Sequence, residues 1–311
     1  MSATVAQTDF AINLLKSASE QTAIISPFSI GIALAMVYTG SDGRTKQQMM
    51  DILAKGATDQ ELHEYFSEIL SNFAGETKDF TLTIANRLYV QKGFNLKDAY
   101  IEAIKEKYSS QLYPIDFKKA AEVAKEVNIF VEEKTNSKIK DLLSTDNIND
   151  DTRLLLINAV YFKGLWLKNF NPKRTLMKSF YISETKQNQV SMMHAEDEFD
   201  YTEDDDVQVL GIPYKDFKSM MYIFLPKQKF ALSEMEKDVN GQWILEHINN
   251  CISTKVNVEI PKFKLEKKFE LVDALCKMGM VDAFEMNADF SKISDAPLFI
   301  SDVIHKVLLE V

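Results

Sequence analysis

Residues 153–162 constrain the fold of this chain more than any other segment. The run reads RLLLINAVYF, and after its first residue it is almost entirely apolar, with many β-branched and aromatic side chains. Such a run is typical of a strand at the centre of a sheet, covered on both faces. The one polar residue inside it is Asn158. An amide in these surroundings is conspicuous, and the segment predicts a buried central strand that carries it.

A second buried element is predicted over residues 27–38, which are apolar on every side of a helix. Ser26 followed by Pro27 is typical of a helix start, where a capping side chain precedes proline at the first helical position. Gly40 stands where a C-terminal cap glycine belongs. We therefore expect a core helix rather than a surface helix.

The period of the apolar residues predicts the remaining elements. Further helices are expected over residues 8–16, 45–53, 61–73, 98–108, 120–135 and 269–278. Further strands are expected over residues 23–25, 80–90, 179–182, 207–214, 220–225, 255–260, 262–265 and 303–311. Helices gather in the first half and strands in the second, with no linker or repeat between them. One α+β domain over residues 1–311 is therefore expected.

The charge balance excludes some classes of partner. The 311 residues hold 46 Asp and Glu against 36 Lys and Arg, a net charge of -10, whereas nucleic-acid binding needs a basic face. The longest apolar run, residues 30–38, is about half of what a bilayer span requires. We expect neither nucleic acid nor membrane as a partner. Residues 196–206 hold eight acidic side chains and predict a solvated loop.

Targeting signals are not visible in the sequence. Residues 1–21 lack the basic and apolar regions of a secretory signal. Cys251 and Cys276 are too few for a disulfide framework, and no N-glycosylation sequon is present. These features favour a cytoplasmic location, while an extracellular one is left open.

No catalytic or ligand-binding motif is recognisable. The chain has neither a Gly-x-Ser-x-Gly turn nor a phosphate-binding loop. No two histidines stand four apart on a helix, and neither cysteine has a second cysteine at a zinc-like spacing. Residues 146–151 are acidic but lack the ligand spacing of a calcium-binding loop. The residues by themselves predict a non-enzymatic domain without metal or cofactor, and nothing more specific.

Several motifs, in order along almost the whole chain, resemble hallmarks of the serpin family of serine and cysteine protease inhibitors. The most specific is NAVYFKGLW at residues 158–166, which is similar to the third strand of the serpin main sheet. The others are SPFSI at residues 26–30, NRLYV at 86–90, NIFV at 128–131, PKF at 261–263, ADFS at 288–291 and HKVL at 305–308. The resemblance implies the serpin fold, with helices packed on a large mixed main sheet and two further sheets.

The resemblance also implies a mechanism without a catalytic centre in this chain. A serpin offers an exposed loop as bait to a serine or cysteine protease. The protease cleaves the loop, becomes acyl-linked, and is carried across the molecule as the loop inserts as a new strand of the main sheet. Such a fold is held in a state that is not its most stable one.

Four polar residues gain a role from the resemblance. In serpins the residues that match Ser26, Ser29, Asn158 and His305 form the shutter, a buried hydrogen-bond cluster under the strands that separate. An amide with two donors and an acceptor, and a histidine that donates and accepts, can tie a helix to two strands. A buried network of this kind is firm when complete and breaks as a unit.

Trp166 and Gly164 match the breach, where the inserting loop first enters the sheet. Each of these roles has a plainer alternative. Ser26 and Ser29 could be only a helix cap and its neighbour, His305 a satisfied core histidine, and Trp166 ordinary core.

The sequence departs from the family at its end. After Val311 a serpin continues into an acidic hinge, a stretch of small residues, the bait loop and further strands. No reactive bond is therefore expected within residues 1–311, and the serpin domain is expected to be C-terminally incomplete. The explanations are a truncated isoform, a larger chain, or a short product with another role. The missing strands would leave apolar surface on residues 207–214 and 220–225.

Three functions follow from these expectations. The first is a protease inhibitor whose active form includes the C-terminal segment. The second is a non-inhibitory serpin with a binding or chaperone-like role. The third is a truncated form that regulates a full-length relative by self-association through open sheet edges, with residues 80–90 or the last strand as edges.

Overall fold

The computed structural model describes residues 3–18, 23–72, 79–108 and 110–310. The chain divides into two compact units. The first comprises Met1–Gly75, Leu82–Tyr161 and Leu265–Leu308, and the second comprises Glu76–Thr81, Phe162–Lys264 and Leu309–Val311. The expectation of one domain over residues 1–311 stays a prediction.

The first unit is built on a five-stranded sheet with the order β2-β1-β3-β10-β9. Its strands are β1 (Phe80–Gln91), β2 (Leu112–Ile115), β3 (Leu154–Gly164), β9 (Lys264–Glu270) and β10 (Ile300–Glu310). Thus β3 lies at the centre, and residues 154–161 are all buried. This confirms the strand predicted from the apolar run.

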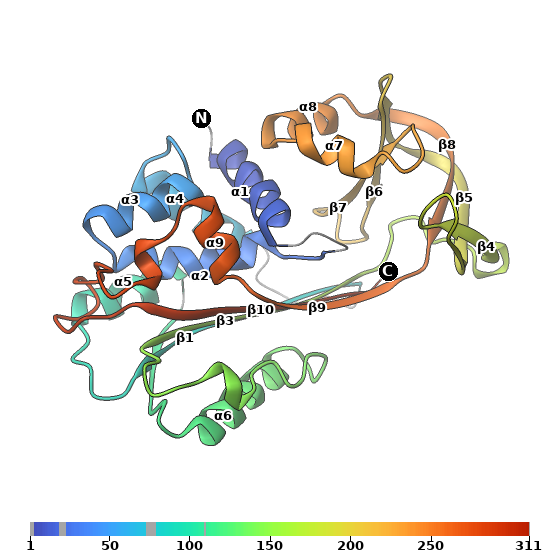
Figure 1. Cartoon of the computed structure of the whole chain (residues 1–311). Coiled ribbons are helices and arrows are strands. Elements are labelled where there is room, and N and C mark those ends of the chain that lie inside the picture. The colour runs from blue at the N-terminus through green and yellow to red at the C-terminus, as the bar shows by residue number, and fades with distance from the viewer. Residues whose placement is uncertain (1–2, 19–22, 73–78, 109, 311) are drawn as a thin grey trace. The chain divides into compact units, whose positions relative to one another are not determined.

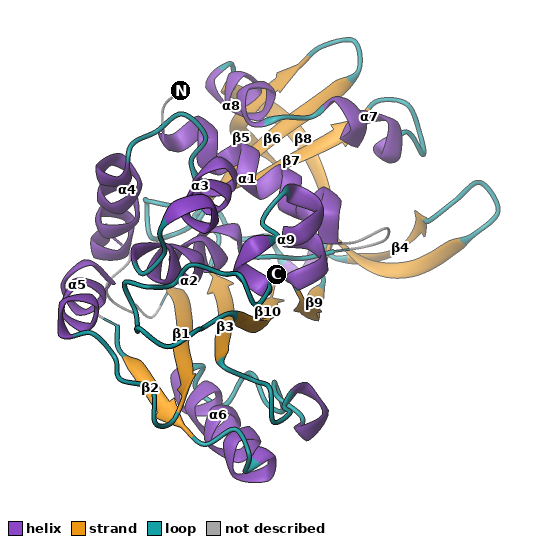
Figure 2. Cartoon of the chain, turned by 60° about the vertical axis from the view of Figure 1, so that its left-hand side comes forward, coloured by secondary structure: helices purple, strands orange, loops and turns teal. Residues whose placement is uncertain are grey.

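Helices cover both faces of this sheet (Figures 1 and 2). The helix α6 (Ala120–Lys134) lies on one face, and α2 (Pro27–Thr39) lies on the other. Around α2 are α1 (Ala3–Ala18), α3 (Gly43–Leu53), α4 (Asp59–Asn72), α5 (Asp98–Tyr108) and α9 (Val272–Met278). Side chains from β3 alternate between the two apolar cores, so that Leu154 and Leu156 face α2 while Leu155 and Ile157 face α6.

The helix α2 is buried at every residue from 29 to 38, as its uniform apolarity predicts. Ser26 and Pro27 take the expected positions at its start, although the Ser26 side chain makes no capping hydrogen bond. Gly40 ends the helix in a right-handed conformation with φ -94°. A Cβ at Gly40 would lie 2.2 Å from Cγ1 of Ile293, so close packing, not a left-handed turn, requires glycine there.

The second unit holds the other sheet, in which β4, β5, β6 and β7 follow in order and β8 pairs with β5. The strands are β4 (Leu176–Tyr181), β5 (Gln187–Glu203), β6 (Val207–Pro213), β7 (Met220–Pro226) and β8 (Ile252–Pro261). Two helices, α7 (Leu232–Asp238) and α8 (Gly241–Asn249), belong to this unit. No residue of β7 is fully buried.

The acidic segment at residues 196–206 is largely strand, so the prediction of a solvated loop is wrong. Residues up to Glu203 belong to β5, which pairs with β8 in an antiparallel register. Lysines neutralise several of its carboxylates: Lys255 pairs with Glu196 at 2.9 Å, and Lys168 pairs with Asp197 at 2.6 Å. Cross-strand partners therefore offset a composition that taken alone indicates a loop.

One other prediction fails because it depends on neighbours in space. Residues 23–25 form no strand. In the strand order, β1 lies between β2 and β3, and β10 lies between β3 and β9. β2 covers only Leu88–Gln91 of β1, so the earlier residues of β1 have no paired strand on that side. Self-association through open sheet edges stays a prediction. Sequence periodicity also missed β5, the longest strand, and three short elements, β2, α7 and α8.

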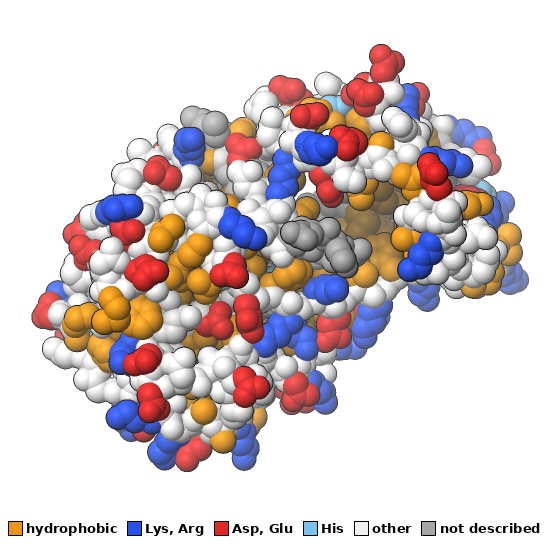
Figure 3. All heavy atoms as spheres, in the orientation of Figure 1, with side chains coloured by type: hydrophobic (Ala, Val, Ile, Leu, Met, Phe, Trp, Pro, Cys, Tyr) orange, Lys and Arg blue, Asp and Glu red, His pale blue; other side chains and the backbone are white. Residues whose placement is uncertain are grey.

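Within the described part of the chain, no helix is both long and apolar enough to cross a membrane. Acidic and basic side chains are interspersed on the visible face of the first unit (Figure 3). That face presents no broad basic surface.

Candidate functional site

A buried polar cluster joins four segments of the first unit that are far apart in sequence. We call it the β3–β10 cluster and define it by Ser26, Ser29, Asn86, Asn158 and His305. The two serines lie at the start of α2, and the other three lie on β1, β3 and β10. Ser29, Asn158 and His305 are completely inaccessible to solvent.

Asn158 is the centre of this cluster. Its Oδ1 accepts a hydrogen bond from the Ser29 hydroxyl at 3.0 Å and a second from Nδ1–H of His305. Its Nδ2 donates to Oδ1 of Asn86. The bond between Asn158 and His305 directly links β3 to β10, which are neighbours in the sheet.

His305 is held as a neutral imidazole in one tautomer. Its Nε2 accepts a hydrogen bond from the backbone N–H of Ser26 at 3.1 Å, while Nδ1 donates to the Asn158 amide oxygen. Burial lowers the pKa of His305 to about 3. A proton on Nε2 would face the Ser26 N–H and remove that hydrogen bond, so the cluster requires the neutral ring.

Asn86 completes the cluster, and its role was missed at the sequence level although the motif that contains it was recognised. Its Nδ2 donates to the backbone carbonyl of Ser29 at 3.2 Å. The sequence does indicate that Asn86 is buried. It interrupts the apolar face of the strand that is formed by residues 80, 82, 84, 88 and 90.

The structure therefore brings together all four residues expected in the shutter. Ser29, Asn158 and His305 take part through their side chains. Ser26 takes part through its main chain: its N–H binds His305, and its carbonyl lies 3.1 Å from the Ser29 hydroxyl. The plainer alternative of a side-chain cap at Ser26 does not hold.

Trp166 and Gly164 lie in the second unit, where both contact Tyr214. The Trp166 ring stacks on the Tyr214 ring with centroids 4.6 Å apart and planes 13° apart. A Cβ at Gly164 would lie 2.5 Å from Cδ1 of Tyr214. Glycine at the end of β3 thus leaves room for the Tyr214 ring to stack on Trp166. Trp166 is 8% exposed.

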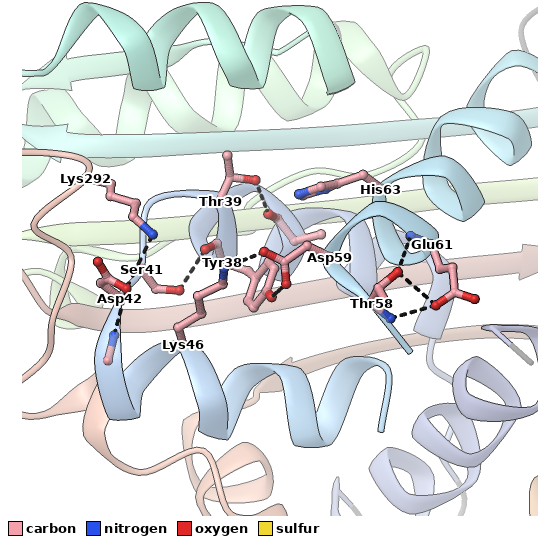
Figure 4. Close-up of polar contacts among 12 residues, drawn as sticks. Tyr38, Thr39, Ser41, Asp42, Lys46, Thr58, Asp59, Glu61, His63 and Lys292 are labelled. Atoms are coloured by element: carbon pink, nitrogen blue, oxygen red, sulfur yellow. Dashed lines mark hydrogen bonds and ion pairs between the residues drawn. The ribbon is translucent and has the colours of Figure 1, made fainter. Parts of the chain in front are cut away.

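A second polar network lies at the other end of α2 (Figure 4). The Tyr38 hydroxyl donates to Asp59, which also pairs with Lys46. His63 contacts the Tyr108 hydroxyl through Nδ1. This network connects α2, α3, α4 and α5.

The groups in this network are not activated for catalysis. Burial raises the pKa of Tyr38 and of Tyr108 well above the ordinary range. Burial also lowers the pKa of His63 to about 4. Burial alone would raise the pKa of Asp59, but hydrogen bonds from Lys46 and Tyr38 bring it below its usual value. The arrangement therefore stabilises the packing of four helices.

No group of three or more histidine, cysteine or acidic side chains that could hold a metal is found among the described residues. Both Cys251 and Cys276 are free thiols. The absence of a metal or cofactor stays a prediction.

Comparisons with known proteins agree with this geometry. Residues 5–311 match the family model described as serpin (serine protease inhibitor). The chain belongs to the serpin family. The leukocyte elastase inhibitor of Xenopus laevis is 37% identical to this serpin over 98% of the chain and 84% of the relative. Human serpin B3 is 34% identical over 98% of the chain and 85% of the relative.

Solved structures show the same serpin fold. Uncleaved ovalbumin superposes with a TM-score of 0.94 at 28% identity, covering 100% of this chain and 86% of that one. Human thyroxine-binding globulin superposes with a TM-score of 0.90 at 25% identity, covering 99% of this chain and 85% of that one. These findings confirm the fold that the sequence motifs implied.

Replacing Asn158 tests how much the β3–β10 cluster contributes to the free energy of unfolding. In Asn158→Ala the buried Nδ1–H of His305 loses its acceptor and Oδ1 of Asn86 loses its donor, while the Ser29 hydroxyl keeps the Ser26 carbonyl. An unsatisfied buried group costs about 1–3 kcal/mol. We expect the free energy of unfolding in urea to fall by about 3 kcal/mol. Asn188→Ala, at an exposed position of β5, is the matched control and should change it by less than about 0.5 kcal/mol. Equal effects of the two changes would contradict the account.

The neutral state of His305 predicts a pH dependence of stability. Its pKa falls from 6.5 in the unfolded chain to about 3 in the folded chain. Between these values the unfolded state holds a proton that the folded state lacks, so the folded state loses stability as pH falls from about 6.5, by about 1.4 kcal/mol per pH unit. His63 contributes in the same direction, with a folded pKa of about 4. Burial raises the pKa of Asp302 to about 6, which acts in the opposite direction between its usual value and that pH.

Comparison with His305→Gln isolates this contribution, because His63 and Asp302 titrate in both proteins. We expect the free energy of unfolding in urea to fall less steeply in the variant as pH decreases from about 6.5 to about 4.5. The difference in slope should correspond to about one proton taken up on unfolding. Parallel curves for the parent and the variant would show that the histidine is not held neutral.

Proposed function

We propose that this chain is the scaffold of an inhibitor of serine or cysteine endopeptidases. The inhibitor acts by cleavage of a bait loop and its insertion into the main sheet between β3 and β10. The bait itself lies outside residues 1–311. The partner is the protease, and the chain acts as a stoichiometric trap, not as an enzyme.

The observation that carries this proposal is the hydrogen bond between Asn158 and His305 across the boundary of β3 and β10. If the two strands separate, this bond breaks. The histidine and the amide are both tied to the start of α2, through Ser26 and Ser29 respectively. One strand cannot move away from the other without also straining the helix contacts.

Such a cluster supports a sheet that stays closed and then opens in one step. Its members are fully buried, so an incomplete set of hydrogen bonds is costly and intermediate states are disfavoured. Once a new strand fills the gap, its backbone supplies donors and acceptors on both sides, and the cost of separation is offset. We therefore assign the shutter role to Ser26, Ser29, Asn158 and His305, and add Asn86.

We assign the entry of the loop to the region of Trp166 and Gly164. Their support is the tight packing on Tyr214, whose ring also meets Phe80 and Phe162 at centroid distances of 6.4 and 5.2 Å. An aromatic group of this kind covers the end of β3 and excludes water until another side chain replaces it.

A second candidate is a non-inhibitory binding role. The observation that favours it is the structural similarity to thyroxine-binding globulin, whose name states that it binds thyroxine. In that role the scaffold is the same, but insertion of a loop is not required.

Complex formation with a protease distinguishes the two functions. The test uses residues 1–311 followed by the reactive loop and C-terminal segment of the Xenopus laevis leukocyte elastase inhibitor, a 37% identical relative. We expect this protein to form a covalent complex with elastase that survives SDS and heat. Proline in the hinge of the loop is the control, because proline cannot pair inside a sheet, and it should convert the protein into a cleaved substrate.

Residues 1–311 alone should give no complex with any protease. A covalent complex with residues 1–311 alone would contradict the proposal that the bait lies elsewhere. Cleavage of the loop without complex formation in the extended protein would favour the binding role.

A further inference from the structure

The strand β4 forms one edge of the sheet in the second unit. It pairs with β5 over Leu176–Tyr181, and no other described strand pairs with it. Figure 2 shows the β4–β5 hairpin with no strand beside the outer side of β4. Along that side the strand presents backbone N–H and carbonyl groups that have no partner in a sheet, which is the template for pairing with another chain.

This edge is apolar and exposed. The large apolar side chains of the segment range from 44% exposed at Phe180 to 63% exposed at Met177. Edge strands are normally protected by charged side chains, proline or a bulge. The one charged residue of β4, Lys178, pairs with Glu259 of β8, and β8 lies on the other side of β5. The lysine therefore extends across the sheet and does not protect the open edge.

Exposed apolar side chains lie on both faces of β4. Met177 and Tyr181 share one face with Ser179, because alternate residues of a strand point the same way. Leu176 and Phe180 lie on the other face. A strand that paired along this edge would therefore cover apolar groups above and below the sheet.

A second copy of β4 fits this edge. Two copies can pair antiparallel about a two-fold axis that passes through Ser179 perpendicular to the sheet. Met177 then lies opposite Tyr181 of the second copy, and Leu176 lies opposite Ile182 of the second copy. A methionine sulfur beside an aromatic ring is a favourable contact. At the axis two small serine hydroxyls meet, so no bulky group separates the strands.

The charges that flank β4 favour this register over its neighbours. Arg174 and Glu184 are exposed, and each is five residues from the centre, on opposite sides of it. Pairing about that centre brings Arg174 of each copy opposite Glu184 of the other. A shift of the centre to Lys178 would set two lysines opposite each other, and a shift to Phe180 would set Arg174 opposite Lys186. Like charges directly opposite destabilise a strand pair.

We propose that β4 pairs with β4 of a second copy, in the antiparallel register centred on Ser179, and so joins two chains in a two-fold dimer with one continuous sheet. The contact is closed, because it uses the β4 edge of both copies. Association therefore stops at the dimer, whereas a head-to-tail contact would continue as a polymer. This surface is separate from the β3–β10 cluster, and the proposal does not rest on protease inhibition.

Sedimentation velocity of residues 1–311 tests the dimer. We expect a monomer–dimer equilibrium with a Kd below about 100 μM. Met177→Lys puts a charge on the apolar edge and should weaken the dimer at least about tenfold. Ile252→Lys is the matched control, because Ile252 is 70% exposed on β8, which pairs with the other side of β5. It should leave the Kd within about twofold.

Charge reversal tests the register. Arg174→Glu and Glu184→Arg each set like charges opposite one another, and each should weaken the dimer at least about threefold in about 50 mM salt. The combined variant restores opposite charges and should return the Kd to within about twofold of the parent value.

A cysteine at the centre tests the register independently. Residues directly opposite in an antiparallel pair have Cα atoms about 4.5–5.5 Å apart, which a disulfide can bridge. With Cys251→Ser and Cys276→Ser as background, Ser179→Cys should form an intermolecular disulfide in oxidised glutathione. Met177→Cys should not, because its counterpart in the second copy lies four residues away along the strand.

Three results would overturn the proposal. The first is a monomer at all concentrations up to about 500 μM. The second is equal weakening by Met177→Lys and Ile252→Lys, which would indicate general apolar association. The third is a dimer that Ser179→Cys does not cross-link, or species larger than a dimer, which would indicate another register or an open contact.

Discussion

The amide of Asn158 is the constraint on which the arrangement of the main sheet depends. A polar side chain at the centre of a buried strand is tolerated only when its hydrogen bonds are satisfied. Its oxygen is shared by Ser29 and His305, and its nitrogen is used by Asn86. These partners lie on α2, β10 and β1. The positions of one helix and two strands relative to β3 are therefore set by one side chain.

The surrounding core makes this constraint strong. Leu154 and Leu156 precede Asn158 on the same face of β3 and are completely buried or nearly so. No water is needed to satisfy the amide, because each of its polar atoms has a protein partner. The same low-polarity surroundings lower the pKa of His305, which keeps the ring neutral and able to accept from Ser26. Burial and hydrogen bonding thus act together: burial favours the neutral ring, and the hydrogen bonds with Ser26 and Asn158 fix its tautomer.

Sequence patterns predicted the elements whose signals are local. The central strand, the core helix and the helix over residues 98–108 follow directly from apolar periodicity, and the structure has α5 at Asp98–Tyr108. The resemblance to the family then predicted that Ser26, Ser29, Asn158 and His305 lie in one cluster. The function of Asn86 could have been inferred from its position on the apolar face of β1. That Ser26 takes part through its main chain could not, because it uses a backbone N–H that every residue except proline possesses.

What the sequence did not predict depends on contacts between distant segments. Residues 196–206 look like a loop until β8 and its lysines are placed beside them. The strand β2 is only four residues long, so it has no periodicity of its own, yet it pairs with the end of β1 over Leu88–Gln91.

The most direct test of the central claim is the coupling energy between Asn158 and His305. Urea unfolding of Asn158→Ala, His305→Ala and the double variant gives this energy from a double-mutant cycle. If the two side chains form one unit, the double variant should be more stable than the sum of the single losses predicts, by about 1.5 kcal/mol or more. Additive losses within about 0.5 kcal/mol would show that β3 and β10 are not held together by this pair.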